Sequence, residues 1–194
     1  MEINQLYLKK ESLKKIKEVF HSSEWLPSVK LPKFLNKQEY NKIKYSIEKL
    51  KYIKIKKPIH CQYEKANITK EIRSLLDSKD FKELIKKITG KSIKNIKGEI
   101  RKFTWKDHTL IHDEQEKPGY DLILEFTDNW KESFGGYTAY TNGLGNSSII
   151  YPEENTLNII QRKKGIQRFI KYINNKAKNK YRYAVFATTT NKRM

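Results

Sequence analysis

The chain has 194 residues, a formal net charge of +19 and 37% hydrophobic residues. This length suits one domain with one hydrophobic core, and the apolar content is enough for a globular fold. No apolar run is long enough for a membrane span and the N-terminus does not resemble a signal peptide, so we expect no membrane partner. The single cysteine, Cys61, excludes an internal disulfide and favours a cytoplasmic location.

The positive charge is concentrated in the two ends of the sequence. Residues 1–60 hold 15 basic and 6 acidic residues, residues 161–194 hold 11 basic and none acidic, and residues 107–160 hold 2 basic and 10 acidic. Basic flanks of this kind are compatible with an RNA- or ribosome-associated partner. Lysine outnumbers arginine 35 to 6, however, and the codon usage of an AT-rich genome explains that excess equally well. Both explanations stay open.

The first 95 residues predict mainly helices, because apolar residues recur at helical spacing between lysines. The expected elements are a helix over 5–20, an extended connection over 21–36, a helix over 37–50 capped by Asn36, a strand over 51–57, and one or two helices over 69–87 with a break at Ser78 or Asp80.

From residue 96 onward, short strand-like runs alternate with Gly, Pro and Asn turns. The expected strands are 97–105, 108–113, 121–127, 136–141, 148–151, 156–161, 166–173 and 182–188. Eight short strands predict a sandwich or a jelly roll, and helices followed by strands predict an α+β fold. We expect a single domain over 1–194, with helical support in 1–95 and the β core in 96–190.

One short motif carries recognisable metal chemistry. His112 is followed two residues later by Glu114, and residues i and i+2 of a strand point to the same face. An imidazole and a carboxylate on one face are two-thirds of the facial triad that binds non-haem iron and leaves coordination positions open. The alternative interpretation of the same residues is a charged loop.

The motif sits within a longer series of residues, all in one order: Phe103, Asp107, His112, Glu114, Trp130, Gly135, Gly136, Pro152 and Asn155. Over roughly residues 97 to 190 this order resembles the prolyl 4-hydroxylase-like branch of the Fe(II)/2-oxoglutarate-dependent dioxygenases. The resemblance implies a double-stranded β-helix with supporting N-terminal helices. It also implies Fe(II), 2-oxoglutarate as co-substrate, and hydroxylation of a prolyl or other side chain on a protein or peptide.

The resemblance departs from the family pattern at the third metal ligand. The distal histidine of the family maps to Gln167, which can offer only a neutral amide oxygen. The basic residue that pairs with the distal carboxylate of 2-oxoglutarate maps to Arg182, which has the planar fork suited to a carboxylate. The resemblance therefore implies His112, Glu114 and Gln167 at the metal and Arg182 at the co-substrate.

Three functions follow from these residues. The first is an oxygenase with an atypical metal site. The second is a binding protein on the same scaffold, with catalysis lost or impaired through Gln167. The third is a basic RNA- or ribosome-associated module, for which binding should depend steeply on salt.

Overall fold

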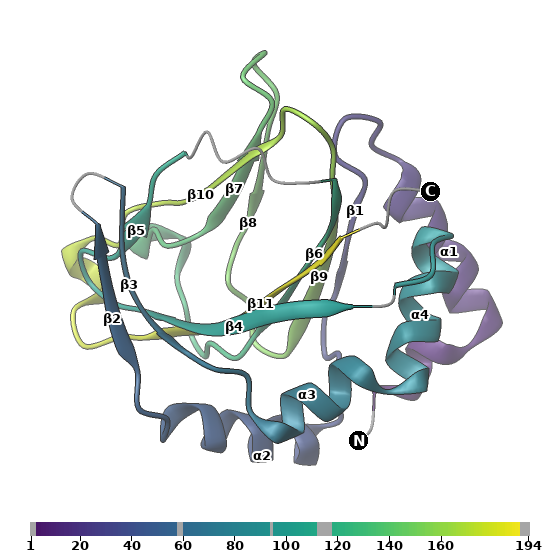
Figure 1. Cartoon of the computed structure of the whole chain (residues 1–194), viewed down its shortest axis with the longest axis horizontal. Helices are drawn as coiled ribbons and strands as arrows, with labels where there is room; N and C mark the ends of the chain where they lie inside the picture. Colours follow the sequence, from purple (N-terminus) through teal and green to yellow (C-terminus); the bar gives the residue numbers. More distant parts are fainter. Residues whose placement is uncertain (1–2, 58–59, 94, 112–117, 191–194) are drawn as a thin grey trace.

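The computed structural model describes residues 3–57, 60–93, 95–111 and 118–190. Its main feature is a strongly curled antiparallel sheet with helices gathered along one side (Figure 1). The helices are α1 (Lys10–His21), α2 (Lys37–Glu48), α3 (Lys70–Asp77) and α4 (Lys79–Thr89), with short 3-10 turns η1 (Gln5–Leu8), η2 (Glu132–Phe134) and η3 (Asn175–Ala177). The strands are β1 (Ser28–Leu31), β2 (Ile53–Lys57), β3 (Cys61–Ala66), β4 (Ile96–Phe103), β5 (His108–Thr109), β6 (Gly119–Glu125), β7 (Thr138–Thr141), β8 (Ser147–Ile150), β9 (Thr156–Arg162), β10 (Gln167–Ile170) and β11 (Arg182–Thr190).

The strand order gives the sheet two walls. It runs β1-β9-β6-β11-β4-β3-β5-β10-β7-β8, with β2 paired to the side of β3. The first wall contains β9, β6, β11 and β4, and the second contains β5, β10, β7 and β8. Strand β3 pairs with both β4 and β5, so it joins the walls where the sheet curls. This arrangement confirms the predicted α+β double-stranded β-helix.

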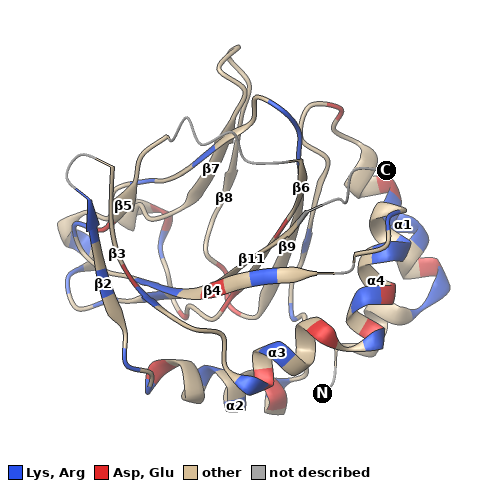
Figure 2. Cartoon of the chain, viewed as in Figure 1, with Lys and Arg blue, Asp and Glu red and all other residues tan. Residues whose placement is uncertain are grey.

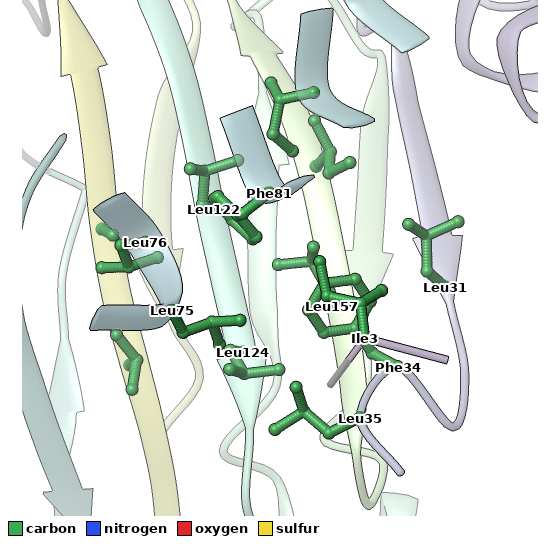
Figure 3. Close-up of a cluster of buried hydrophobic side chains, with 14 of the residues drawn as sticks. Ile3, Leu31, Phe34, Leu35, Leu75, Leu76, Phe81, Leu122, Leu124 and Leu157 are labelled. Atoms are coloured by element: carbon green, nitrogen blue, oxygen red, sulfur yellow. The ribbon is translucent and has the colours of Figure 1, made fainter. Parts of the chain in front are cut away.

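Alternation along the strands of the first wall separates two hydrophobic cores. Leu122 and Leu124 of β6 pack toward the helices, while Ile123 between them packs between the two walls. Figure 3 shows the helix-side core, where Phe81 and Leu75 from the helices lie against β6 and β9. Each such side chain contributes about 1.5–3 kcal/mol when fully buried, which holds the helices on the sheet.

The helix boundaries follow the capping residues. Asn36 begins α2 by accepting a hydrogen bond from the backbone N–H of Glu39 at 2.8 Å, as predicted. Ser78 separates α3 from α4 and accepts from the backbone N–H of Phe81 at 3.2 Å, so the segment 69–87 forms two helices.

All eight strands predicted after residue 96 are present, with ends shifted by a few residues. Two strands were not predicted. Strand β1 lies within the expected extended connection, where it pairs with β9, and β3 pairs with β2, β4 and β5. The first 95 residues therefore add three strands to the sheet as well as helices, and the single-domain division stays a prediction. No helix in the described part of the chain is long and apolar enough to cross a membrane.

Candidate active site

The described chain continues beyond β5 to Ile111, the residue before the predicted metal motif. Thr109 pairs with Ile170 of β10 in antiparallel register, so the chain after Thr109 heads toward the Gln167 end of β10. His112 and Glu114 themselves lie outside the described residues, and their assignment as metal ligands stays a prediction. Gln167 begins β10 opposite Thr141 of β7 and is half-buried.

His108 of β5, four residues before His112 in the sequence, makes contacts within the fold. His108 of β5 contacts the Lys106 carbonyl oxygen through Nδ1 at 3.0 Å, and its ring lies 6.0 Å from that of Tyr172. Within the described ranges, no three His, Cys, Asp or Glu side chains gather as metal ligands would. A complete iron site would therefore need the side chains of the segment 112–117.

Arg182, the residue predicted to hold 2-oxoglutarate, lies fully buried between the two walls at the start of β11. Its Nη1 donates to the Gly136 carbonyl oxygen at 2.6 Å and its Nη2 donates to Thr138 Oγ1 at 3.0 Å. The same guanidinium forms an ion pair with the fully buried carboxylate of Glu125 and donates to it from both Nη2 and Nε.

These contacts test whether the site fits 2-oxoglutarate. A second carboxylate at Arg182 would have to displace Glu125 or lie beside it, and two like charges in a buried site repel strongly. In this arrangement Arg182 holds the carboxylate of Glu125, and 2-oxoglutarate could pair with Arg182 only by displacing that carboxylate or lying beside it. The assignment of Arg182 to the co-substrate stays a prediction.

A second buried charge cluster lies near the start of β6, around Asp121. Asp121 forms ion pairs with Arg162 of β9, at 2.8 Å from Oδ1 to Nε, and with Arg168 of β10, at 2.7 Å from Oδ2 to Nη1. Tyr140 of β7 donates its hydroxyl hydrogen to Asp121 Oδ2 at 2.8 Å. Burial and the neighbouring Asp121 charge hold the pKa of Tyr140 well above its usual value. Asp121 therefore links both walls through charged and polar side chains.

Sequence reasoning missed both clusters, although one signal was present. Asp121 and Glu125 interrupt the apolar segment from Tyr120 to Phe126, and their spacing of four places both on one face of a strand. Two carboxylates facing an apolar interior need buried cationic partners. The partners themselves, Arg162, Arg168 and Arg182, lie more than thirty positions later, so spacing alone does not identify them.

The remaining residues of the predicted series have structural roles. Phe103 is fully buried in the core between the walls. Asp107 accepts from the Thr104 backbone N–H at 2.9 Å and from Gln62 Nε2 at 3.0 Å, and burial raises its pKa. The Asn155 side chain accepts from the backbone N–H of Leu35 at 2.9 Å and donates to its carbonyl oxygen at 2.8 Å, which ties the turn after β8 to the N-terminal segment.

Trp130 and the glycine pair fix the entry to β7. Trp130 Nε1 donates to the Gly135 carbonyl oxygen at 2.9 Å, and Gly135 and Gly136 have φ of 74° and 69°. An alanine Cβ at Gly135 would overlap the carbonyl oxygen of Tyr172. A glycine is therefore required here both by backbone conformation and by space.

Gly135→Ala should lower the free energy of unfolding by about 2 kcal/mol or more, because strain at positive φ adds to the overlap with Tyr172. Gly165→Ala is the matched control, since Gly165 has φ of 83° but nothing within 4 Å of the added Cβ. Urea unfolding of both variants measures the difference. Equal losses in the two variants would show that the close approach at Gly135 contributes nothing.

The family comparison matches residues 49–193 of the chain to the family described as "Oxoglutarate and iron-dependent oxygenase degradation C-term". The chain belongs to this family. Family membership agrees with the predicted resemblance and with the curled two-walled sheet.

Relatives and solved structures of this kind include prolyl hydroxylases. The prolyl 3-hydroxylase OGFOD1 of Xenopus laevis is 34% identical over 89 residues, which cover 43% of this chain and 17% of that protein. The mouse protein of the same name is 30% identical over 90 residues, 44% of this chain and 16% of the relative. The chain thus matches about a sixth of the length of these family relatives.

Two solved structures share the fold. A Pseudomonas putida prolyl-4-hydroxylase superposes with a TM-score of 0.71 at 9% identity, covering 91% of this chain and 99% of that one. A Trichoplax adhaerens prolyl hydroxylase, in complex with a hypoxia inducible factor oxygen degradation domain peptide fragment, superposes with a TM-score of 0.70 at 11% identity, covering 94% and 93%. These superpositions confirm the double-stranded β-helix of the oxygenase family.

Proposed function

We propose that the chain is an Fe(II)/2-oxoglutarate-dependent oxygenase of atypical metal site that hydroxylates a side chain of a protein or peptide. Membership of the oxoglutarate and iron-dependent oxygenase family carries the proposal. The course of the chain after β5, toward the Gln167 end of β10, supports it, because His112 and Glu114 follow on that segment.

In this proposal, His112, Glu114 and Gln167 would hold the metal. Bound iron and co-substrate would supply the oxidising chemistry, while the protein positions the substrate. A protein or peptide substrate is proposed from the relatives named prolyl 3-hydroxylase and from the Trichoplax enzyme with its bound peptide fragment. An RNA- or ribosome-associated partner and a cytoplasmic location stay predictions.

A second candidate function is supported by the buried charges. The Glu125 carboxylate forms an ion pair with the guanidinium of Arg182, and Asp121 pairs with Arg162 and Arg168 across the interior. These ion pairs leave the oxygenase fold intact, but the Glu125 carboxylate takes the position at Arg182 that a carboxylate of 2-oxoglutarate would need. Such a chain would act as a protein-binding domain on the same scaffold.

Anaerobic titration with Fe(II) by calorimetry, with and without 2-oxoglutarate, distinguishes the two functions. The oxygenase proposal expects the wild-type protein to bind iron and 2-oxoglutarate to tighten that binding. Gln167→His should strengthen iron binding at least about tenfold, because an imidazole replaces a neutral amide oxygen. Gln161→His, on β9, is the matched control and should leave iron binding as in the wild type.

The remaining outcomes favour the binding domain. If only Gln167→His binds iron, the metal site has decayed while the scaffold survives. If neither protein binds iron, the proposed ligand set is wrong. Glu125→Gln adds a second readout, because binding of 2-oxoglutarate that appears only in this variant would show that Glu125 blocks Arg182.

A further inference from the structure

The outer face of the sheet carries a row of basic and aromatic side chains beyond the edge of the helix layer. Backbone pairing places Lys54 of β2 opposite Glu64 of β3, Glu64 opposite Lys102 of β4, and Lys102 opposite Tyr183 of β11. Directly paired residues of neighbouring strands point to the same face. We call the surface formed by Lys54, Lys56, Lys102, Tyr181 and Tyr183 the basic sheet face.

This face continues the one that packs under the helices. Ile100 and Val185, each two residues from the row on its own strand, belong to the helix-side core. Further along the row, Lys54 and Lys56 are exposed and Tyr181 is 46% exposed. These exposures show that the helix layer does not cover this part of the face. The basic sheet face is therefore the open end of an otherwise covered surface.

Aromatic rings and lysines alternate across the face. The ring of Tyr183 lies 6.1 Å from that of Tyr52 and 6.2 Å from that of Tyr181. Lys102 Nζ lies 5.4 Å from the centre of the Tyr52 ring and 4.7 Å from that of Tyr181. The rings are thus held in a fixed cluster around one ammonium group, and the exposed Tyr181 leaves part of its surface open to a ligand.

The surroundings of the face are strongly positive. From Lys49 to Lys57 the sequence holds five lysines and no acidic residue, and the segment 176–180 adds three more lysines. Thr104 Oγ1 donates to the Lys180 carbonyl oxygen at 3.2 Å, which holds this second segment beside the end of β4. Figure 2 shows the basic residues on β2 at this edge of the sheet.

Three described carboxylates lie near the face: Glu64, Glu48 and Asp107, which accepts from Gln62 and interacts electrostatically with Lys54. Glu64 pairs with Lys102 at 2.7 Å, and Glu48 of α2 lies 3.7 Å from Lys44. Glu64 therefore offsets the charge of Lys102, and Glu48 shares Lys44 with Asp128. The positive charge of the face comes mainly from the exposed lysines of β2. The face remains positive overall and suits an anionic chain.

We propose that the basic sheet face binds single-stranded nucleic acid. Lysines supply contacts to phosphates, and aromatic rings on a sheet stack on unpaired bases. A duplex hides its bases from such rings, and an anionic membrane surface would need the lysines but not a cluster of tyrosine rings beside them. This inference does not depend on the oxygenase proposal, because it uses the outside of the sheet.

Fluorescence anisotropy with labelled oligouridine tests the proposal on the full chain. The double variant Lys54→Glu/Lys56→Glu should bind about tenfold or more weakly. The matched control Lys10→Glu/Lys14→Glu makes the same charge change on α1 and should bind within about twofold of the wild type. Tyr181→Ala should weaken binding about fivefold or more, because a stacking platform is lost.

Several outcomes would overturn the proposal. Equal losses in the two double variants would show diffuse attraction by net charge. Wild-type affinity in Tyr181→Ala, or equal affinity for duplex DNA, would exclude stacking on unpaired bases. Equally strong binding to phosphatidylserine vesicles, with the same loss in the β2 variant, would identify a membrane surface instead. Circular dichroism confirms that each variant is folded.

Discussion

Arg182→Met should lower the free energy of unfolding by about 3–5 kcal/mol, which is among the largest effects expected for any single substitution in this chain. Methionine fills much of the same space but leaves the Glu125 carboxylate charged and buried without its partner. It also removes the hydrogen-bond donors to Gly136 and Thr138, which lie just before and at the start of β7 in the second wall. Urea unfolding followed by circular dichroism gives the measurement.

The double variant Arg182→Met/Glu125→Leu is the informative companion. Replacing both members of a buried ion pair with apolar side chains is often nearly neutral, so most of the lost stability should return. Arg73→Met is the control, because Arg73 is exposed and donates a hydrogen bond to the Ile96 carbonyl oxygen at 2.8 Å. A loss in Arg182→Met no larger than in the control would contradict the prediction.

Asp121→Asn should cost a similar amount, about 3–5 kcal/mol, for the complementary reason. The amide keeps the shape of the carboxylate but not its charge, so Arg162 and Arg168 lose the anion they share. Tyr140 also loses a charged acceptor for its hydroxyl hydrogen. Because Asp121 contacts β7, β9 and β10, the substitution weakens the contacts between the two walls, and this lowers the free energy of unfolding.

Glu99→Gln is the matched control for Asp121→Asn. Glu99 pairs with Arg101 at 2.7 Å and with Lys65 at 3.3 Å, but its side chain is 25% exposed. Solvent screens such pairs, so the control should lose only about 0–1 kcal/mol. Comparable losses in the two variants would mean that burial of Asp121 adds nothing to its ion pairs.

The strands after residue 96 could be predicted because short apolar runs lie between clear turn signals, and β6, whose residues are all buried, is the best example. Strand β1 could not, because Pro27 and Pro32 flank it and favour an extended connection. Prolines are tolerated there because β1 pairs only with β9 and lies at the end of the described sheet order. Strand β3 has a mixed polar sequence, and its pairing with β2, β4 and β5 fixes it instead.

The candidate site could be predicted only as an order of residue types. That order indicated the family and assigned Arg182 to the co-substrate, but it did not reveal that the Arg182 guanidinium pairs with Glu125. Pairs such as Arg182 with Glu125 form between strands far apart in sequence, and no local periodicity encodes them. His112 and Glu114 stay predictions that the metal titration tests.

The position of β11 has a consequence for how the protein forms during synthesis. Within the sheet β11 lies between β4 and β6, yet it follows every other strand in the sequence. A ribosome that has released residues 1–181 has therefore left β4 and β6 with a gap between them and Glu125 without its arginine. The first wall is complete only after Arg182–Thr190 has emerged. We therefore expect the sheet to be completed after translation of β11. Until then the open edges of β4 and β6 are exposed to wrong pairing, and this stage should depend most on chaperones.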